Sequence, residues 1–559
     1  MHYPYDGLEP YTLAELFDRS IHLYKNKPVL SKINENPMSY NEFSKKVASC
    51  VEILKENGIK KGDKVALLSE NMPNWAVAYF SVTYIGAIIV PILPDFNPAD
   101  VHHILRHSEA KGIFVSHKHQ HTVEELEQSN ISFVINLDSL QQIEDLNNFS
   151  YIAQFRKKVR DTIKRTEEQY RPKEDDIAAL LYTSGTTGHS KGVMLTHKNL
   201  VTNAMSSFSV LKITPDDVFL SMLPLAHTFE CTVGLIVPIL HGSSVVYLDK
   251  APTPSILLKA FSKVRPTMML SVPLVIEKIF KNKILTKINE SFITRTLYKI
   301  SFFKRLFHKK AGAKLKETFG GRLRFYGIGG APLPTYVEEF LYDGDIPYVV
   351  GYGLTETAPL LCGTPLNAQK KIGSTGPALY GVEIKIKDKN ESGEGEILAK
   401  SPSVMLGYYK DEEKTKETFD EDGWFITGDL GYLDEDGYLF ISGRSKNMIL
   451  GPSGENIYPE QLESIINEHP LILDALVLEQ NGKLIARIHL DYEQIDKLLK
   501  ANERSDEEVR KDIQKMLEGM RVEMNTRFAS FAKITKFVEQ IEPFIKTPTK
   551  KIKRYLYQE

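Results

Sequence analysis

The sequence predicts an α/β fold built on buried, largely parallel sheets. Short apolar runs typical of strands alternate with segments of helical periodicity; examples are Lys64–Ser69, Gly112–Val115 and Ile177–Tyr182. This alternation is typical of parallel strands, which need a crossover connection between them. The chain also has 559 residues, more than one compact core usually holds, so we expect several lobes.

The elements of the first two thirds follow in a regular order. Apolar residues at helical spacing predict an amphipathic helix over Thr12–Val29. The longest apolar stretch, Trp75–Leu93, is interrupted by polar residues and a glycine, which predicts a buried helix running into a strand rather than a membrane span. Further strands are predicted at Ser244–Leu248, Met268–Leu270 and Arg324–Ile328.

The pattern changes twice in the last third. From about Gly376 the chain is rich in glycine, aspartate and short β-rich runs, which predicts a small antiparallel, β-barrel-like lobe. After Arg444 the pattern becomes α+β, with helices expected at Pro459–Glu468, Tyr492–Leu499 and Asp506–Phe528 and strands at Ile472–Leu478 and Leu484–Leu490. We therefore expect a large N-terminal domain, residues 1–445, and a smaller C-terminal domain, residues 446–559.

Composition and charge narrow the functional classes. Hydrophobic residues make up 42% and charged residues 25%, as in a globular protein, and the net charge of -2 does not indicate nucleic-acid binding. The three cysteines, Cys50, Cys231 and Cys362, are far apart and lack metal-ligand spacing, which fits a reducing compartment. The first residues show no secretory signal pattern, so the expected location is the cytoplasm.

The most specific local feature is the segment 181–193, where an apolar strand runs into a loop rich in glycine and hydroxyl side chains. Glycine lets the backbone approach an anion closely, hydroxyl and N–H groups donate hydrogen bonds, and one lysine neutralises charge. A flexible linker would not contain this strand and lysine, and the loop lacks the ending of a Walker A motif. It fits the phosphates of a nucleoside triphosphate, through Thr183, Ser184, Gly185, Thr186, Thr187 and Lys191.

This loop resembles the signature of the adenylate-forming (AMP-binding) superfamily, which includes acyl-CoA synthetases, firefly-type luciferases and the adenylation domains of peptide synthetases. The other family motifs follow in order over nearly the whole chain, and the long-chain fatty acyl-CoA synthetase branch is the most similar. The resemblance implies ATP, Mg²⁺ and coenzyme A as cofactors. A fatty acid would be joined to AMP with release of pyrophosphate, and the acyl group would then pass to CoA.

The resemblance also assigns roles in nucleotide binding. The glycine-rich segments 327–332 and 351–357 would contact the adenine, and Tyr352 offers its ring face to the base. Glu356 is a hard oxygen ligand suited to Mg²⁺, and Thr183 is a second candidate for metal binding and catalysis. Asp429 would accept hydrogen bonds from the ribose hydroxyls. The remaining nucleotide contacts implied are Gly329, Gly330, Ala331, Gly353, Thr355 and Arg444.

The C-terminal third resembles the mobile part of the superfamily. Lys446 falls at the hinge, and Gly454 would line the pantetheine channel. Lys551 resembles the catalytic lysine near the C-terminus; the alternative is a solvated basic tail. The sequence departs from many relatives at Asn447, where they have Asp, at Leu450, where some have Lys, and at Lys550, where many have Gly.

Two segments bear on the acyl substrate. In long-chain synthetases a segment like 224–230 lies at the acyl pocket, which would place His227 near the adenylate as a catalytic candidate; a core histidine satisfied by its hydrogen bonds is the alternative. The segment Lys281–Lys316 holds eleven lysines and arginines interleaved with aromatic and aliphatic residues. It fits either peripheral contact with an anionic membrane or a solvated helical insertion with a core-facing aromatic stripe.

Two other functions remain open. An acyl-AMP ligase that transfers to the phosphopantetheine of a carrier protein would have the same motifs. A non-catalytic nucleotide- or acyl-binding module is the alternative of another class. An inactive relative would have lost at least one of the chemically important residues, whereas this chain retains Lys191, Glu356, Asp429, Arg444 and Lys551.

Overall fold

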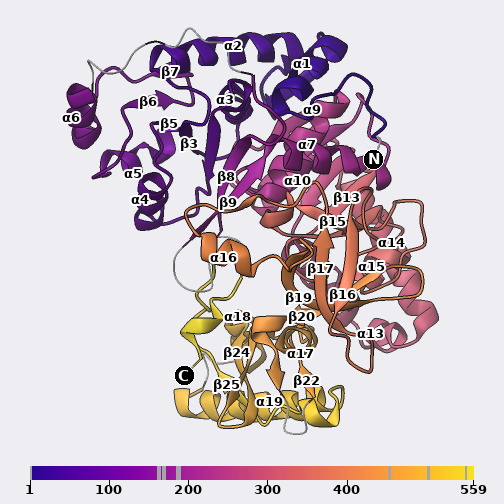
Figure 1. The fold of residues 1–559 in the computed structure, drawn as a ribbon. Helices are drawn as coiled ribbons and strands as arrows, with labels where there is room; N and C mark the ends of the chain where they lie inside the picture. The colour runs from indigo at the N-terminus through magenta and orange to yellow at the C-terminus, as the bar shows by residue number, and fades with distance from the viewer. Residues whose placement is uncertain are drawn as a thin grey trace.

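The computed structural model describes residues 3–159, 165, 171–183, 190–450, 455–499, 504–547 and 551–558. Two eight-stranded sheets form the large N-terminal part (Figure 1). The first has the spatial order β18 (Gly407–Tyr408), β9 (Lys191–Thr196), β8 (Ile177–Thr183), β4 (Ile88–Ile92), β3 (Lys64–Leu68), β5 (Gly112–Val115), β6 (Phe133–Asn136), β7 (Gln141–Gln142). Its five central strands β8, β4, β3, β5 and β6 pair with one another in parallel. The outer strands β18, β9 and β7 join the sheet by antiparallel pairings.

The second sheet repeats this arrangement. Its order is β15 (Leu360–Gly363), β14 (Tyr348–Gly353), β13 (Phe325–Ile328), β12 (Met268–Ser271), β10 (Val218–Ser221), β11 (Ser244–Tyr247), β1 (Pro28–Lys32), β2 (Met38–Ser39). The six strands from β14 to β1 pair in parallel, and only the edge strands β15 and β2 are antiparallel. The predicted α/β class with largely parallel sheets is therefore confirmed.

Helices cover the sheets and connect their strands. The helices of the N-terminal part are α1 (Leu13–Tyr24), α2 (Tyr40–Glu56), α3 (Pro73–Tyr84), α4 (Pro98–His107), α5 (Gln120–Glu124), α6 (Ser150–Val159), α7 (His197–Ser206), α8 (Thr228–Cys231), α9 (Val237–His241), α10 (Pro254–Val264), α11 (Pro273–Ile279), α12 (Thr286–Asn289), α13 (Phe292–Tyr298), α14 (Ser301–Thr318), α15 (Thr335–Asp343) and α16 (Glu412–Glu417). None of the helices in the described ranges is long and apolar enough to cross a membrane.

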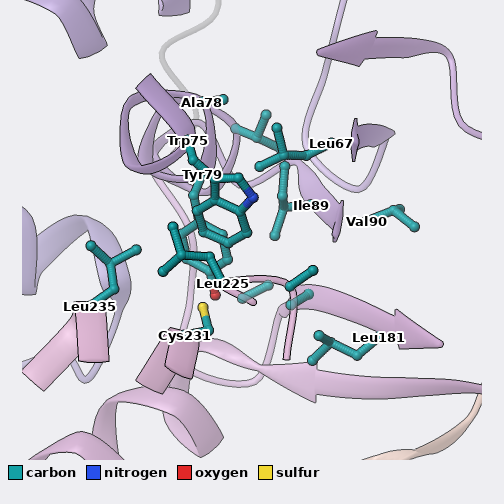
Figure 2. Close-up of a cluster of buried hydrophobic side chains, with 14 of the residues drawn as sticks. Leu67, Trp75, Ala78, Tyr79, Ile89, Val90, Leu181, Leu225, Cys231 and Leu235 are labelled. Carbon is teal, nitrogen blue, oxygen red and sulfur yellow. The ribbon is translucent and has the colours of Figure 1, made fainter. Parts of the chain in front are cut away.

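The core between the two sheets is centred on Trp75 and Tyr79 of α3. Their rings stack with centroids 5.3 Å apart. Figure 2 shows these rings with Leu67 and Ile89 from the first sheet and with Leu225 and Cys231 from the segment that follows β10 of the second. Both rings are fully buried, and side chains of this size contribute a large apolar area to a core. The connection after β10 is therefore fixed by the same cluster that joins the sheets.

One predicted helix is too long. The expected Thr12–Val29 helix ends at Tyr24, and Pro28 begins β1. The proline has no backbone N–H for a helix, and Leu30 pairs with Val245 of β11 instead. Val29 is thus buried as a strand residue, and the apolar pattern that extended the helix belongs to two elements.

The last third holds two further units. The predicted antiparallel lobe is a four-stranded sheet in the order β16 (Glu383–Lys387), β17 (Gly395–Lys400), β19 (Phe425–Leu433), β20 (Leu439–Arg444). The C-terminal part contains β21 (Ile449–Leu450), β22 (Asn456–Ile457), α17 (Pro459–Ile466), β23 (Ile472–Gln480), β24 (Lys483–Leu490), α18 (Tyr492–Leu499), α19 (Asp506–Asn525) and β25 (Lys536–Glu539). It has a separate buried cluster, whose members lie between Ile457 and Phe537. The C-terminal part contacts the N-terminal part at several places, and at one of them the Lys281 amino group donates to the Asn467 carbonyl oxygen.

Candidate active site

The β8–β9 hairpin positions the two ends of the predicted phosphate loop. Thr183, the last residue of β8, and Lys191, the first residue of β9, are cross-strand partners. The hairpin register therefore brings both side chains to the same end of the first sheet. The predicted loop contacts Ser184, Gly185, Thr186 and Thr187 lie outside the described residues.

Glu356 lies in a short 3₁₀ turn, Thr355–Thr357, directly after β14. Its Oε1 accepts a hydrogen bond of 2.9 Å from the hydroxyl of Tyr408 in β18. The Lys191 Nζ lies 5.4 Å from the centroid of the same Tyr408 ring. The ends of the two sheets therefore meet here, and one tyrosine contacts both the acid from the second sheet and the lysine from the first.

Positive charge gathers around this acid. Burial lowers the pKa of Lys191, repulsion from Lys414 and Lys446 adds to the shift, and Asp411 and Glu356 oppose it. Lys446 lies in the 3₁₀ turn Ser445–Asn447 that follows β20. A cluster of three lysines beside the phosphate loop is suited to an anionic ligand.

Asp429 and Arg444 form a second group on the antiparallel lobe. They are cross-strand partners on β19 and β20, and the Arg444 Nε lies 2.9 Å from Asp429 Oδ1. The hydroxyl of Tyr352 in β14 donates to Asp429 Oδ2 at 2.7 Å. Burial raises the pKa of Tyr352, and the adjacent Asp429 charge adds to it. A carboxylate has about four lone-pair directions, so Asp429 retains capacity to accept from further hydroxyl groups.

The predicted glycines differ in how strictly their positions require glycine. A Cβ on Gly353 would lie 1.8 Å from the Pro359 carbonyl oxygen, so this position requires glycine. Gly330 has a φ of +86°, which L side chains rarely adopt. Gly329 follows β13, and a Cβ there would lie 3.4 Å from the Phe229 ring. Its neighbour Ala331 is exposed.

Lys551 reaches this region from the C-terminal part. A hairpin-like bridge joins Lys546 to Ile552, and the Thr547 N–H donates to the Lys551 carbonyl oxygen at 2.7 Å. Although the residue as a whole is exposed, crowding around its amino group lowers the pKa of Lys551. Repulsion by Arg444 adds to the shift, and Asp429 and Glu356 oppose it. The structure thus brings Lys551 to the same place as both acids.

His227 lies beside this group. Its Nδ1 accepts a hydrogen bond of 3.2 Å from the Phe229 N–H and caps α8. Burial, with repulsion from Lys551, lowers the pKa of His227 to about 4, so the ring is neutral near pH 7. A Cβ on Gly329 would lie 3.4 Å from the Phe229 ring, so the segment that contains His227 borders the predicted adenine turn.

The hinge region is partly described. Lys446 is exposed, the Ser445 hydroxyl donates to the Gly428 carbonyl at 3.1 Å, and the Asn447 amide donates to Glu460 at 2.6 Å. Asn447, the departure from many relatives, therefore bonds a carboxylate in α17, which an aspartate at this position would repel. The predicted pantetheine contact Gly454 lies outside the described residues.

Two contacts were missed by sequence reasoning. Tyr408 lies in the segment Gly407–Tyr409, an aromatic pair beside a glycine that carried no recognised chemical pattern. Arg554 belongs to the same basic C-terminal segment as Lys551, and its guanidinium bonds Glu463 at 2.6 Å and the Val477 carbonyl at 2.6 Å. These bonds fix the segment that contains Lys551 to α17 and β23.

The residues present fit a metal ion that arrives with a nucleotide. No group of three or more His, Cys, Asp or Glu side chains suited to a metal occurs in the described part of the chain. Mg²⁺ in nucleotide sites is often held by one or two protein oxygens together with phosphates. Glu356 and Thr183 offer a carboxylate and a hydroxyl of this kind.

Comparisons with known proteins show which sequences and folds this chain is similar to. Long chain acyl-CoA synthetase 7, peroxisomal, from Arabidopsis thaliana is 28% identical over 92% of this chain and 79% of its own length. The long-chain-fatty-acid--CoA ligase of Salmonella typhimurium is 29% identical over 82% of this chain and 81% of its own length. ATP-bound MatB from Rhodopseudomonas palustris has a similar fold, with a TM-score of 0.74, 24% identity and 98% of both chains covered. The family model described as AMP-binding enzyme matches residues 17–409, and the chain therefore belongs to this family.

Proposed function

We propose that the protein is an AMP-forming fatty acid–CoA ligase for long-chain substrates. It would join a fatty acid to AMP with release of pyrophosphate and then transfer the acyl group to CoA. The observation that carries the proposal is the convergence of Glu356, Asp429, Arg444 and Lys551, from three separate units of the fold, around one position. The names of the curated relatives, long-chain acyl-CoA synthetases and ligases, support the substrate class.

ATP would lie between the two sheets and the antiparallel lobe. Asp429 accepts from the ribose hydroxyls, while Tyr352 and the turn Gly329–Ala331 contact the base. Thr183, Lys191 and Thr355 bind the phosphates, with the segment 184–187 completing the loop. Glu356 and Thr183 hold Mg²⁺, which supplies neutralisation of phosphate charge when bound.

In the first half-reaction the fatty acid carboxylate attacks the α-phosphorus and pyrophosphate leaves. Negative charge grows on the α-phosphoryl oxygens and on the leaving group, so fixed cations at this position stabilise the transition state. Lys551 and Arg444 are the cations beside Asp429 in this structure. His227, neutral because of its lowered pKa, is an uncharged hydrogen-bonding group beside the carboxylate.

The second half-reaction needs a different arrangement. While Lys551 occupies the site, it fills space that the CoA thiol must enter. We place the domain boundary at 445/446, which the separate core of the C-terminal part supports. Residues 446–559 would rotate about Lys446, remove Lys551 and bring Gly454 to the pantetheine channel.

A carrier-protein phosphopantetheine is the alternative acceptor, and one experiment separates the possibilities. Purified protein is incubated with ATP, Mg²⁺, CoA and acids from acetate to stearate, and AMP and acyl-CoA are measured together. Thioester formation that is greatest with long-chain acids supports the proposal. AMP without thioester assigns the acceptor to a carrier protein, and no AMP with any acid leaves a non-catalytic binding module.

Peripheral membrane contact is a second part of the proposal. Apolar side chains on α13 and α14 point to solvent: Phe292 is 74% exposed and Phe302 72%, and Ile293, Ile300 and Leu306 are at least half exposed. Exposed cations surround them, namely Arg295, Lys299, Arg305, Lys309 and Lys310. Phe303 and Phe307 of the same segment are half-buried, so the exposed residues form only part of the aromatic stripe. Apolar anchors among cations suit an anionic bilayer.

Sedimentation with vesicles tests this contact. We expect the protein to bind phosphatidylcholine vesicles containing phosphatidylglycerol and to be released by salt. The double change Phe292→Ser and Phe302→Ser removes the anchors, whereas Leu23→Ser, at a residue 50% exposed on α1, is the matched control. Equal vesicle binding by the double variant and the Leu23→Ser control would contradict the proposal that this surface contacts the membrane.

A further inference from the structure

A buried carboxyl group lies behind the segment that contains His227. Glu230, in the first turn of α8, is 1% exposed, and its Oε1 accepts a hydrogen bond of 2.6 Å from the hydroxyl of Ser221 at the end of β10. Its Oε2 has no hydrogen-bond partner within the described ranges. Glu230 has no part in the catalysis proposed above, and an ionised carboxyl at this depth is costly unless it is paired and hydrogen-bonded.

The fold makes room for this carboxyl. A Cβ on Gly234 would lie 2.9 Å from the Glu230 carboxyl carbon. Gly234 belongs to the π-helical turn Thr232–Ile236, a local departure from α-helix that follows α8. Any larger side chain at Gly234 would therefore displace the acid, and π-turns of this kind are frequent at functional sites.

Asn71 holds the same segment from the other side. Its amide nitrogen donates to the Ser221 hydroxyl at 2.9 Å and to the Leu223 carbonyl at 2.6 Å, and its Oδ1 accepts from the Leu225 N–H at 2.9 Å. Ser221 is thus bonded to both Asn71 and Glu230. Asn71 therefore bonds residues 221, 223 and 225 of this segment, and His227 is the next residue in the alternation.

We propose that Glu230 and Asn71 are positioning residues that fix the segment 222–227 and thereby aim His227 and Phe229 at the adenylate. The inference rests on the proposed function, because the effect is expected on the adenylation step. Glu230 touches neither substrate nor cofactor in this account. It acts through Ser221 and the backbone beside it.

The surroundings keep the acid neutral. Burial raises the pKa of Glu230 to about 8, and the Ser221 hydroxyl with the Leu223 and Met222 N–H groups opposes the shift. The other titratable groups that face it are Tyr247 of β11 and Cys231 of α8, and burial raises the pKa of both. No cation in the described part of the chain pairs with it, so an ionised Glu230 would carry an uncompensated charge into the core, and the segment should loosen above about pH 8.

The test uses ATP–pyrophosphate exchange, which omits CoA and so avoids titration of its thiol. Glu230→Gln keeps the shape and the oxygen for Ser221 but does not ionise, whereas Glu230→Ala removes both. We expect wild-type kcat to fall above about pH 8. Glu230→Gln should reduce that fall, the remainder belonging to Lys551, whose pKa burial lowers, and should remain within about threefold of wild type at pH 7. Glu230→Ala lowers kcat about tenfold or more with little change in the ATP KM.

Glu338→Gln is the matched control, because Glu338 is another buried carboxyl whose pKa is raised by burial, in α15 and bonded to Gly373 and Tyr348. Its alkaline profile should stay that of the wild type. Circular dichroism at the assay temperature identifies variants that fail to fold, and Glu230→Gln tests the inference even if Glu230→Ala does not fold. An alkaline fall that is the same in Glu230→Gln as in the wild type overturns the inference. If the wild-type protein catalyses no pyrophosphate exchange with any fatty acid, the proposed function fails instead.

Discussion

Asp429 and Arg444 face each other across β19 and β20, with Arg444 Nε 2.9 Å from Asp429 Oδ1 and the Tyr352 hydroxyl 2.7 Å from Oδ2. The pair lies at the end of the antiparallel lobe, immediately before the 3₁₀ turn that contains Lys446. Through Tyr352 it is tied to β14 of the second sheet. This carboxylate is therefore held in place by two donors while keeping lone pairs for a ligand.

Replacing Asp429 by Asn should weaken ATP binding. The change removes the charge that Arg444 pairs with and one acceptor oxygen, and hydrogen bonds to charged groups contribute about 1.5–3 kcal/mol. We expect the KM for ATP to rise about tenfold or more, measured by pyrophosphate exchange. Glu421→Gln, an exposed acid in the turn before β19, should leave it unchanged. An unaltered KM in Asp429→Asn would contradict the ribose assignment.

Removing the hydroxyl of Tyr408 should raise the requirement for Mg²⁺. Tyr408→Phe deletes the 2.9 Å hydrogen bond to Glu356 and leaves the ring beside Lys191. A net hydrogen-bond contribution of about 1 kcal/mol predicts a severalfold higher half-saturating Mg²⁺ concentration. Tyr409→Phe is the control, since its hydroxyl bonds the exposed Glu109 at 3.2 Å. Equal Mg²⁺ dependence in the two variants would separate Tyr408 from the metal site.

Acid should destabilise the protein through His197. Burial lowers its pKa to about 3, and its Nδ1 accepts from the Leu13 N–H at 3.1 Å, so the folded state needs the neutral ring. A base whose folded pKa is depressed loses stability as pH falls below its unfolded value near 6.5. Between pH 6.5 and 5 we expect a loss of about 2 kcal/mol in the free energy of unfolding.

Denaturant unfolding at several pH values measures this loss. His197→Asn places an oxygen near the position of Nδ1 and removes the titration, so its stability should change less between pH 6.5 and 5. His22→Gln, at an exposed position in the last turn of α1, should keep the wild-type slope. A His197→Asn slope equal to that of the wild type would show that this ring does not carry the effect.

The Arg554–Glu463 pair should matter for adenylation although it lies outside the site. Arg554→Ala removes the 2.6 Å bonds to Glu463 and to the Val477 carbonyl, which fix the segment holding Lys551. We expect pyrophosphate exchange to fall about tenfold or more, because a misplaced catalytic group loses most of its effect. Lys553→Ala, one residue away and equally basic, is the control. Similar rates in the two variants would mean that Lys551 is positioned by other contacts.

Elements with clean local patterns were predicted well. β5 has the expected bounds Gly112–Val115, and α18 has the expected bounds Tyr492–Leu499. The helix over Thr12–Val29 was too long because the polar run from Lys25 to Lys27, which separates α1 from β1, fits the exposed side of a helix as well as a turn. The pairing of Pro28–Lys32 with β11, more than two hundred residues later in the chain, depends on tertiary contacts.

The site divides in the same way. Glu356, Asp429 and Lys551 belong to motifs whose residues carry recognisable chemistry, so their candidacy follows from the sequence. Tyr408 and Glu230 were missed because a tyrosine beside a glycine and an acid after an aromatic residue have no distinctive local pattern. Their importance comes from partners far away in sequence, Glu356 in one case and Ser221 with Asn71 in the other.

The two half-reactions of Lys551→Ala test the central claim most directly. Pyrophosphate exchange with a long-chain acid measures adenylation, and thioester formation from supplied acyl-adenylate and CoA measures transfer. If Lys551 acts only in the first step, the exchange rate falls about a hundredfold or more while the transfer rate stays within about threefold of wild type. An unchanged exchange rate, or equal losses in both steps, would contradict the account in which the C-terminal domain carries this lysine into and out of the site.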